Sequence, residues 1–401
     1  MLDVLDRRSL PSRVASFLAL ERNVVAVSAA MLLLALGENL WQKFLPKYLQ
    51  ALGAPIAAIR LFGSAKDFLD GVYQYPGGWL GDRLGRRAAL FAFAVVAMIG
   101  YAIFAIAPSW PWIIGGLLLV SAWSSMGSPT LFAVVGDALP KGKRAMGFTV
   151  QSILRRVPIA IAPIVGGLVI VRFGLVTGIR ALLVVTLVLG VIALTALARV
   201  RIARMAGPDT DIHGIWRTFP SPLRWLLVSD IFIRACEGLV DVFLVIYATT
   251  IVGISAPRYG LLIAVQMTTS IAVYLPAAKI ADRVGRKPFV IATFLAFAFF
   301  PLAVVHAHSF AALIAAFIAG GLREIGEPSR KALIVDFAEP AIRARVVGLY
   351  YLIRSVAIAP AAFAGAVLWE RHPSNPFLAA FAVGLAGTFL FALTVREEHA
   401  G

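Results

Sequence analysis

Cysteine is nearly absent from this 401-residue chain, and histidine is rare. The sequence holds one cysteine, Cys236, and five histidines. A single thiol excludes a disulfide framework and a metal site built from several cysteines. The sequence also has no GxxxxGK[ST] phosphate-binding loop and no HExxH zinc motif. We therefore expect no ATP hydrolysis, no metal site, no cofactor and no enzyme chemistry.

Charged residues are also scarce. They make up 14% of the chain, while hydrophobic residues make up 60%. A soluble domain carries about 25% charged residues. The composition therefore predicts a polytopic membrane protein, in contact with the lipid bilayer along most of its length. The net charge of +16 does not indicate a nucleic-acid partner, because the basic residues sit in short clusters between apolar runs.

Twelve membrane-spanning helices are predicted from the apolar runs, six in each half. They lie near 24–50, 54–81, 86–107, 110–138, 143–172 and 175–200, and then near 221–252, 256–281, 286–308, 309–338, 342–371 and 374–395. The predicted fold is an all-α membrane protein of two pseudo-symmetric six-helix bundles. The expected domains are 1–200, which includes a basic cytosolic lead-in, a cytoplasmic linker at 201–220, and 221–401.

The basic residues predict the orientation of these spans. More than half of the lysines and arginines fall in the two termini and in the loops after even-numbered spans. The opposite loops hold only Arg60, Arg172, Arg180, Arg258 and Arg371. Positively charged loops stay in the cytoplasm. Both termini are therefore expected inside the cell, in a bacterial inner membrane.

The two halves repeat with an offset of 199 or 200 residues. The stretch GENLWQKFLPKYL, from Gly37, aligns with CEGLVDVFLVIYA, from Cys236. Glu38 thereby matches Glu237, and Asp137 matches Asp336. Two related six-span halves are typical of secondary transporters, in which the substrate site lies near the bilayer midplane and the halves rock to give alternating access.

Two basic hairpins carry a resemblance to a known family. The stretch GGWLGDRLGRR (77–87) follows the second predicted span, and ADRVGRKP (281–288) follows the eighth. Together with the repeat, they make the chain resemble the major facilitator superfamily over essentially its full length. APIVGG (162–167) is similar to a proline–glycine motif of antiporters in that family, although the usual glycine before the proline is missing.

The resemblance implies a cytoplasmic gate, in which a charge network latches one conformation. Gly81 and Gly85 of the first hairpin would permit a tight turn, and an aspartate can cap a helix N-terminus. In the second hairpin Ala281 replaces the first of these glycines, and Gly285 is the other. The alternative is that the arginines only anchor the topology. The expected gate residues are Gly81, Asp82, Arg83, Gly85, Arg86, Arg87, Asp137, Asp282, Arg283, Gly285, Arg286 and Asp336.

Several charges fall inside predicted spans. A charge at the bilayer centre costs at least about 2.5–3.5 kcal/mol, so it is expected to be paired or functional. The seventh span places Asp230, Arg234, Glu237 and Asp241 on one helical stripe. Arg330 and Lys331, in the tenth span, are expected to line the cytoplasmic side or to extend their charges towards water.

Roles follow from the chemistry of these groups. Glu38 and Glu237 are expected to be proton-coupling acids, because partial removal from water favours the neutral form of a carboxylate; the alternative is a static pair with Arg155, Arg234 or Arg323. Arginine can grip a carboxylate or phosphate with two hydrogen bonds. The expected substrate-binding residues are Arg155, Arg354, Arg323, Arg234, Glu327, Asp241, Tyr350 and Gln266.

The sequence thus predicts a secondary active transporter for a small organic solute, with protons as coupling ions and the single chain working as a monomer. The arginines favour an anionic or zwitterionic solute. The acids and the APIVGG stretch favour the alternative, a multidrug or cation:proton efflux pump. A transporter-like sensor or an intramembrane enzyme is a remote alternative.

Overall fold

The computed structural model describes residues 22–199, 211–254 and 256–395. Within these ranges every regular element is a helix, which confirms the predicted all-α class. The first half contains α2 (Arg22–Trp41), η1 (Gln42–Phe44), α3 (Leu45–Ala51), α4 (Ile56–Val72), α5 (Gln74–Leu84), α6 (Arg86–Ile106), α7 (Trp110–Ser121), η2 (Ala122–Met126), α8 (Gly127–Ala138), η3 (Lys141–Lys143), α9 (Arg144–Phe173) and α10 (Leu175–Ala198).

The second half has corresponding spans that are divided into helices differently. It contains α11 (Ile212–Arg217), α12 (Ser221–Ile246), η4 (Tyr247–Ile251), α13 (Ala256–Val284), α14 (Lys287–Val305), α15 (Phe310–Gly321), η5 (Leu322–Glu324), α16 (Glu327–Asp336), η6 (Pro340–Ile342), α17 (Arg343–Ile358), α18 (Ala361–Arg371) and α19 (Asn375–Thr394).

Nine helical segments of the described residues are long and apolar enough to cross a membrane. The three other predicted spans, at 54–81, 221–252 and 309–338, are helical as well. Each of these three carries a group of charged residues, such as Lys66 and Asp70, or Asp230 and Arg234. Charges lower the hydropathy of a span. The count of twelve therefore remains a prediction for these three segments.

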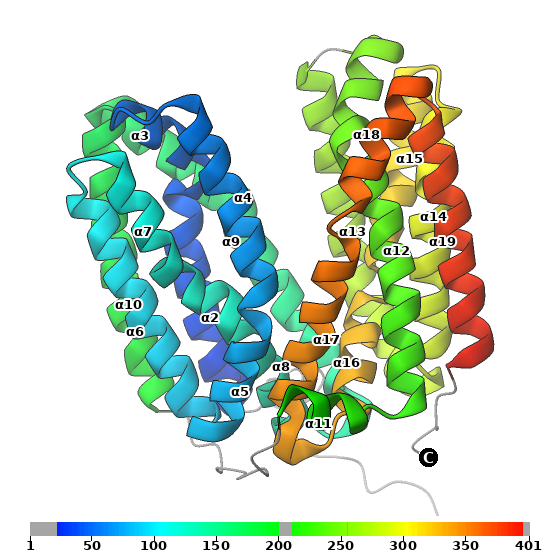
Figure 1. Ribbon diagram of the computed structural model, residues 1–401, viewed down its shortest axis with the longest axis horizontal. Coiled ribbons are helices and arrows are strands. Elements are labelled where there is room, and N and C mark those ends of the chain that lie inside the picture. Colours follow the sequence, from blue (N-terminus) through cyan, green and yellow to red (C-terminus); the bar gives the residue numbers. More distant parts are fainter. Residues whose placement is uncertain (1–21, 200–210, 255, 396–401) are drawn as a thin grey trace, which may run out of the picture. The chain divides into compact units, whose positions relative to one another are not determined.

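The chain divides into two compact units. Among the described residues, the first unit holds 22–140, 150–199, 211–215 and 338–352, and the second holds 141–149, 216–254, 256–337 and 353–395. In the first unit α2 packs against α10, and α10 packs against α6. In the second unit α12 and α19 run side by side, and α19 packs against α14 (Figure 1).

Residues that match in the two halves make matching contacts. The Tyr48 hydroxyl donates to the carbonyl oxygen of Phe104 at 3.0 Å, and the Tyr247 hydroxyl donates to that of Val305 at 3.0 Å. Tyr48 and Tyr247 are 199 residues apart, which is the offset read from the sequence. Both hydroxyls are thereby satisfied inside an apolar core, where an unpaired hydroxyl would be costly. The repeat in the sequence is thus also a repeat of packing.

Glycine makes the two basic hairpins possible. Gly85 and Gly285 adopt φ angles of +89° and +109°, a region that residues with a side chain rarely enter. Gly85 is the single residue between α5 and α6, and Gly285 follows α13 in the equivalent hairpin. The tight turns expected from the sequence are present at both positions.

A second pair of glycines allows close helix contact. A Cβ atom at Gly166 of α9 would meet the carbonyl oxygen of Leu40 of α2, and one at Gly365 of α18 would meet that of Leu239 of α12. These residue pairs again differ by 199 positions. In both halves, therefore, a glycine lets two helix backbones touch, as small residues commonly do inside membranes.

We expect Gly166→Ala to lower the stability of the purified protein by about 1–3 kcal/mol, the usual cost of overpacking. The added methyl group would press on the Leu40 backbone, which cannot turn aside as a flexible side chain could. Thermal unfolding in detergent measures this. Gly167→Ala is the matched control, because the nearest atom to its added methyl group would be Phe44 Cζ at 3.5 Å. Equal stability of the two variants would contradict the prediction.

Candidate transport and gating residues

Asp82 is the centre of a charge network in the first unit. Its side chain is buried, with the residue 2% exposed, and it pairs with Arg86 one turn further along the chain. It also accepts hydrogen bonds from the backbone amide of Arg345 at 2.9 Å, from that of Ala344 at 3.3 Å, and from Arg345 Nε at 3.2 Å. Ala344 and Arg345 lie in the first turn of α17. Asp82 therefore caps this helix and complements the positive end of its dipole.

Asp137 joins the same network from α8. Its carboxylate lies 3.2 Å from Nε of Arg86 and also pairs with Arg343 at the start of α17. Arg86 in addition donates to the carbonyl oxygen of Pro340 at 3.2 Å. One arginine thus links two carboxylates and a backbone carbonyl, which holds its planar fork in a single orientation.

The second unit contains an equivalent arrangement. Asp336 of α16 pairs with Arg286 and with Arg144. Arg286 also donates to the carbonyl oxygen of Lys141. Asp336 and Arg286 match Asp137 and Arg86, and Arg144 matches Arg343. Both networks therefore place a carboxylate between two arginines.

The other predicted gate residues are placed as follows. Arg83 is exposed and stacks on the ring of Trp79, with its Cζ 4.9 Å from the ring centre. Arg87 and Arg283 are exposed as well. A Cβ atom at Gly81 would press on the Thr130 side chain. The side chain of Asp282, at the end of α13, lies outside the described residues.

Three arginines of these networks were not predicted from the sequence: Arg144, Arg343 and Arg345. The repeat offset held a signal for two of them, because Arg144 and Arg343 are 199 residues apart and each begins a helix. Arg345 has no basic mate, because Met146 occupies the equivalent position. Only the fold shows that its side chain reaches Asp82.

A second charge network, the inner charge cluster, lies within the second unit. It consists of Asp230, Arg234, Glu237, Arg323, Glu327, Arg330, Lys331 and Arg354. At its centre, Arg330 Nη1 lies 2.6 Å from Asp230, and its other guanidinium nitrogens lie 2.6 and 3.0 Å from the two oxygens of Glu327. Arg330 is 1% exposed and Asp230 is 0% exposed. The expectation that Arg330 lines a cytoplasmic surface or extends towards water was wrong, because two carboxylates hold it in the interior.

Arg234 connects this centre to Glu237. Its Nη2 lies 3.0 Å from Glu327, and its Nη1 lies 2.9 Å from Glu237. Arg323 Nη1 approaches Glu237 at 3.6 Å. Both guanidinium groups lie over the ring of Phe297, at 5.0 and 4.9 Å from its centre, where the negative face of an aromatic ring attracts a cation.

Arg354 approaches the cluster from α17. Its Nη1 lies 3.2 Å from Asp230. Asp230 and Arg330 were not among the predicted site residues, although Asp230 starts the helical stripe seen in the sequence. The cluster brings together one predicted proton acceptor, Glu237, and four of the predicted substrate-binding residues, which are Arg234, Arg323, Glu327 and Arg354.

The remaining predicted substrate ligands of the second half and of α17 lie elsewhere. Asp241 is exposed. Gln266 donates to the carbonyl oxygen of Gly320 at 3.5 Å. Tyr350 is buried and packs against Tyr351, with ring centres 5.4 Å apart. These positions leave their predicted roles untested.

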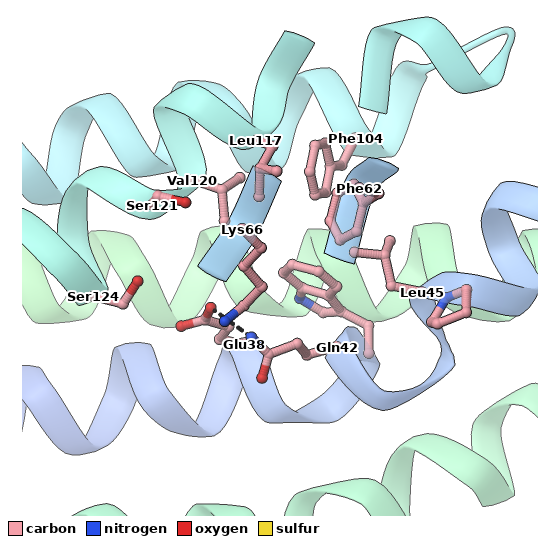
Figure 2. Close-up of a pocket in the computed structure, with 12 residues that line it drawn as sticks. Glu38, Gln42, Leu45, Phe62, Lys66, Phe104, Leu117, Val120, Ser121 and Ser124 are labelled. Carbon is pink, nitrogen blue, oxygen red and sulfur yellow. Dashed lines mark hydrogen bonds between the residues drawn. The ribbon is translucent and has the colours of Figure 1, made fainter. Parts of the chain in front are cut away.

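Glu38 occupies a different setting in the first unit. It is buried, and its carboxylate accepts a hydrogen bond from the Gln42 amide at 3.2 Å. It lines a pocket formed by α2, α4, α6 and α7, into which the Lys66 side chain also extends (Figure 2). Lys66 itself pairs with Asp70 at 3.0 Å. Arg155, the predicted counterpart of Arg354, is exposed on α9. The two predicted proton acceptors thus differ, because Glu237 pairs with arginines and Glu38 bonds to a neutral amide.

Comparison with proteins of known sequence identifies relatives. YqjV of Bacillus subtilis, an uncharacterized MFS-type transporter, is 28% identical over 186 residues, which are 45% of this chain and 43% of YqjV. The chain therefore matches less than half the length of YqjV. MJ1317 of Methanocaldococcus jannaschii, another uncharacterized MFS-type transporter, is 21% identical over 381 residues, covering 90% of this chain and 91% of MJ1317.

Solved transporter structures have the same fold. FucP in its outward conformation matches with a TM-score of 0.80 and 14% identity, over 93% of this chain and 99% of FucP. The human organic anion transporter MFSD10 matches with a TM-score of 0.78 and 17% identity, over 92% of this chain and 99% of MFSD10. The profile of the Major Facilitator Superfamily matches residues 27–234 and 226–401. The chain therefore belongs to the Major Facilitator Superfamily and is a multi-pass membrane transporter, not an enzyme.

Proposed function

We propose that this protein is a proton-coupled secondary transporter of small organic solutes that carry a negative charge. The observation that carries the proposal is the charge balance of the inner charge cluster. Three carboxylates, those of Asp230, Glu237 and Glu327, are joined to Arg234, Arg323, Arg330, Arg354 and Lys331. Arginine remains protonated in proteins. Within these ion pairs of the described residues, five cationic side chains therefore meet three carboxylates.

An excess of positive charge inside a membrane protein is costly unless an anion offsets it. A carboxylate or phosphate group of a solute would supply that charge and could accept two parallel hydrogen bonds from one guanidinium group. Arg354 and Arg323 stand at the edge of the cluster, with longer ion-pair contacts to carboxylates, of 3.2 and 3.6 Å. We therefore assign these two arginines to the solute and the more deeply held Arg330 to the stability of the cluster. MFSD10, which shares this fold, is an organic anion transporter, and this agrees with the proposed class of solute.

Proton coupling is assigned to Glu38. Its buried carboxylate accepts a hydrogen bond from the neutral Gln42 amide. Lys66, which lines the same pocket, is paired with Asp70 at 3.0 Å. Glu237, which has Arg234 at 2.9 Å and Arg323 at 3.6 Å, is assigned a smaller part. A nearby opposite charge favours the ionised carboxylate, and burial favours the neutral one.

The same proposal includes the setting of the protein. The distribution of basic residues between the loops supports cytoplasmic termini, and we place the chain in a bacterial inner membrane as a monomer. The networks around Asp82 and Asp336 are proposed to form the cytoplasmic gate, because each combines a hairpin arginine with an arginine at the start of a distant helix.

Arg354→Ala is expected to reduce solute-driven proton flux at least tenfold, because it removes a solute ligand while Arg330 still holds Asp230. Liposomes that contain the purified protein and a trapped pH-sensitive dye would be given a panel of organic anions and a panel of lipophilic cations. Arg354→Lys, which keeps the charge but loses the planar fork, is expected to retain part of the flux. Arg371→Ala, a change at an exposed arginine at the end of α18, is the control.

The two panels separate the proposed function from its main alternative. Flux that follows anions and is lost in Arg354→Ala supports the anion transporter. Flux that follows cations and is unaffected by Arg354→Ala would show that the protein is a cation:proton antiporter. In the same assay Glu38→Gln is expected to abolish proton movement, and unchanged movement would overturn the assignment of the proton to Glu38.

A further inference from the structure

The stretch that joins α11 to α12, residues 216–225, carries two exposed arginines. We call this stretch the linker corner, and it lies wholly within the second unit. Arg217 ends α11, and Arg224 lies near the start of α12. The Nη2 atom of Arg224 lies 3.5 Å from the carbonyl oxygen of Arg217, so both side chains start from the same place. Both arginines lie outside the gate networks and the inner charge cluster defined above.

Arg224 is held in place by its neighbours. Its Cζ atom lies 5.2 Å from the centre of the Trp216 ring, whose negative face attracts a cation. Its Nη2 atom also donates to the carbonyl oxygen of Trp216 at 3.3 Å. The Trp216 ring in turn packs against the buried ring of Phe219, with 5.1 Å between centres. A side chain that is already ordered loses little conformational entropy when a ligand binds. Arg224 is therefore preorganised to meet an anion.

The stretch around these arginines contains no carboxylate. Residues 212–229 include neither aspartate nor glutamate, so the positive charge of this stretch is not offset within it. The aspartate that precedes the stretch, Asp211, accepts a hydrogen bond from the backbone amide of Gly214 at 2.8 Å. It thereby caps the start of α11, six residues before Arg217.

An exposed apolar face continues from the arginines along α12. Trp225 directly follows Arg224 and is 40% exposed, and Phe232, two turns further on, is 37% exposed. Residues seven apart lie on the same face of a helix. Tryptophan is enriched where lipid headgroups meet the acyl chains. The linker corner thus combines a charged part with an apolar part, and the boundary between them falls at Arg224 and Trp225.

From this arrangement we propose that the linker corner is a binding site for one anionic phospholipid, with the phosphate between Arg217 and Arg224 and an acyl chain along the α12 face of Trp225 and Phe232. A phosphate can accept two parallel hydrogen bonds from a planar guanidinium group. The cytoplasmic leaflet is rich in anionic lipids, and the corner follows the segment expected to be a cytoplasmic linker. A soluble phosphate would leave the apolar face uncovered, whereas a phospholipid covers both parts.

Native mass spectrometry of the full-length protein in detergent would test the site. The protein would be titrated with phosphatidylglycerol and, separately, with phosphatidylcholine of the same chain length. The first phosphatidylglycerol is expected to bind at least tenfold more tightly than phosphatidylcholine, and an excess of glycerol 3-phosphate should not displace it. Equal binding of the two lipids would overturn the proposal. Displacement by glycerol 3-phosphate would overturn it too, because the ligand would then be a soluble phosphate.

Two double variants of equal charge locate the site. Arg217→Gln with Arg224→Gln is expected to weaken binding of the first phosphatidylglycerol at least tenfold. Arg258→Gln with Arg371→Gln is the control, because it also removes two exposed arginines, one of which stacks on the Phe310 ring at 5.3 Å. The control is expected to bind as the wild type does. Undiminished binding in the first double variant, or an equal loss in both, would refute the site.

Variants of Trp225 test the apolar part of the site. Trp225→Ser is expected to weaken binding of phosphatidylglycerol about fivefold, and Trp225→Phe, which keeps an aromatic ring, is expected to retain most of it. Trp225 and both arginines of the corner are exposed, so these variants are suited to folding, and thermal unfolding would check this. Equal binding in Trp225→Ser and the wild type would contradict the placement of the acyl chain. The inference does not depend on the proposed anion transport, because it is tested without a solute.

Discussion

Replacing Arg330 by methionine is expected to destabilise the protein by about 3–5 kcal/mol, the usual cost of breaking a buried ion pair from one side. Arg330 makes contacts of 2.6 Å with Asp230 and of 2.6 and 3.0 Å with Glu327. Asp230 is 0% exposed, so water cannot replace the lost guanidinium group. Methionine retains much of the apolar stem and removes the charge.

The measurement is the free energy of unfolding in mixed micelles, followed by the loss of helical circular dichroism as a denaturing detergent is added. Lys331→Met is the matched control, because it removes a positive charge from the next residue. Lys331 lies 3.7 Å from Glu327, and its side chain is more exposed than that of Arg330. We expect a loss below about 1 kcal/mol for Lys331→Met, as for partly exposed pairs.

A double variant separates lost pairing from lost packing. If Arg330→Met is harmful because it leaves Asp230 charged and buried, then Asp230→Asn in the same chain should recover part of the stability. The double variant would cost less than the sum of the two single variants, as contacting residues usually show. Strict additivity, or an Arg330→Met protein within about 0.5 kcal/mol of the wild type, would contradict this account of the cluster.

Local chemistry explains which features could be read from the sequence. The turns at Gly85 and Gly285 depend on residues next to each other in the chain, and both have the positive φ angles that the motif requires. The repeat offset also relates residues that are far apart in the chain. It paired Asp137 with Asp336, and in the structure each of these carboxylates lies between two arginines. The repeat predicts positions correctly because the two halves pack their helices through matching contacts, such as those of Tyr48 and Tyr247.

The inner charge cluster could be predicted only in part. The helical stripe correctly grouped Asp230, Arg234 and Glu237, which share ion pairs, but Asp241 on the same stripe is exposed. The spacing of charges along α12 predicts which side chains share a face of that helix. It does not predict which neighbouring helix packs against each part of that face. Arg330 illustrates the limit, because its partners Asp230 and Glu327 lie 100 and three residues away, and only tertiary packing brings the first of them into contact.

Asp82→Asn is expected to expose the first turn of α17 to solvent exchange. In the wild type the Asp82 carboxylate accepts hydrogen bonds from the backbone amides of Ala344 and Arg345, at 3.3 and 2.9 Å, as well as from Arg345 Nε at 3.2 Å. Hydrogen bonds to a charged group contribute about 1.5–3 kcal/mol. Asparagine keeps the shape of the side chain, loses the charge and replaces one acceptor oxygen by an amide nitrogen, which cannot accept a backbone N–H.

Hydrogen–deuterium exchange with mass spectrometry, on a peptide that covers residues 340–352, measures the effect. Since about 1.4 kcal/mol corresponds to a factor of ten, we expect exchange at these amides to become about 10–100 times faster. Arg83→Gln is the control. It changes the neighbouring residue, which is exposed and stacks on Trp79, and it should leave the exchange of this peptide unchanged.

The comparison also decides between two interpretations of the basic hairpin. If Arg83→Gln and Asp82→Asn both leave exchange unchanged, the hairpin charges only anchor the topology, and the contacts of Asp82 with α17 contribute little. If only Asp82→Asn accelerates exchange, one buried carboxylate holds the start of a helix that lies more than 250 residues further along the chain. A switchable latch needs a contact of this kind, because it depends on a single charge and can be released without unfolding either helix.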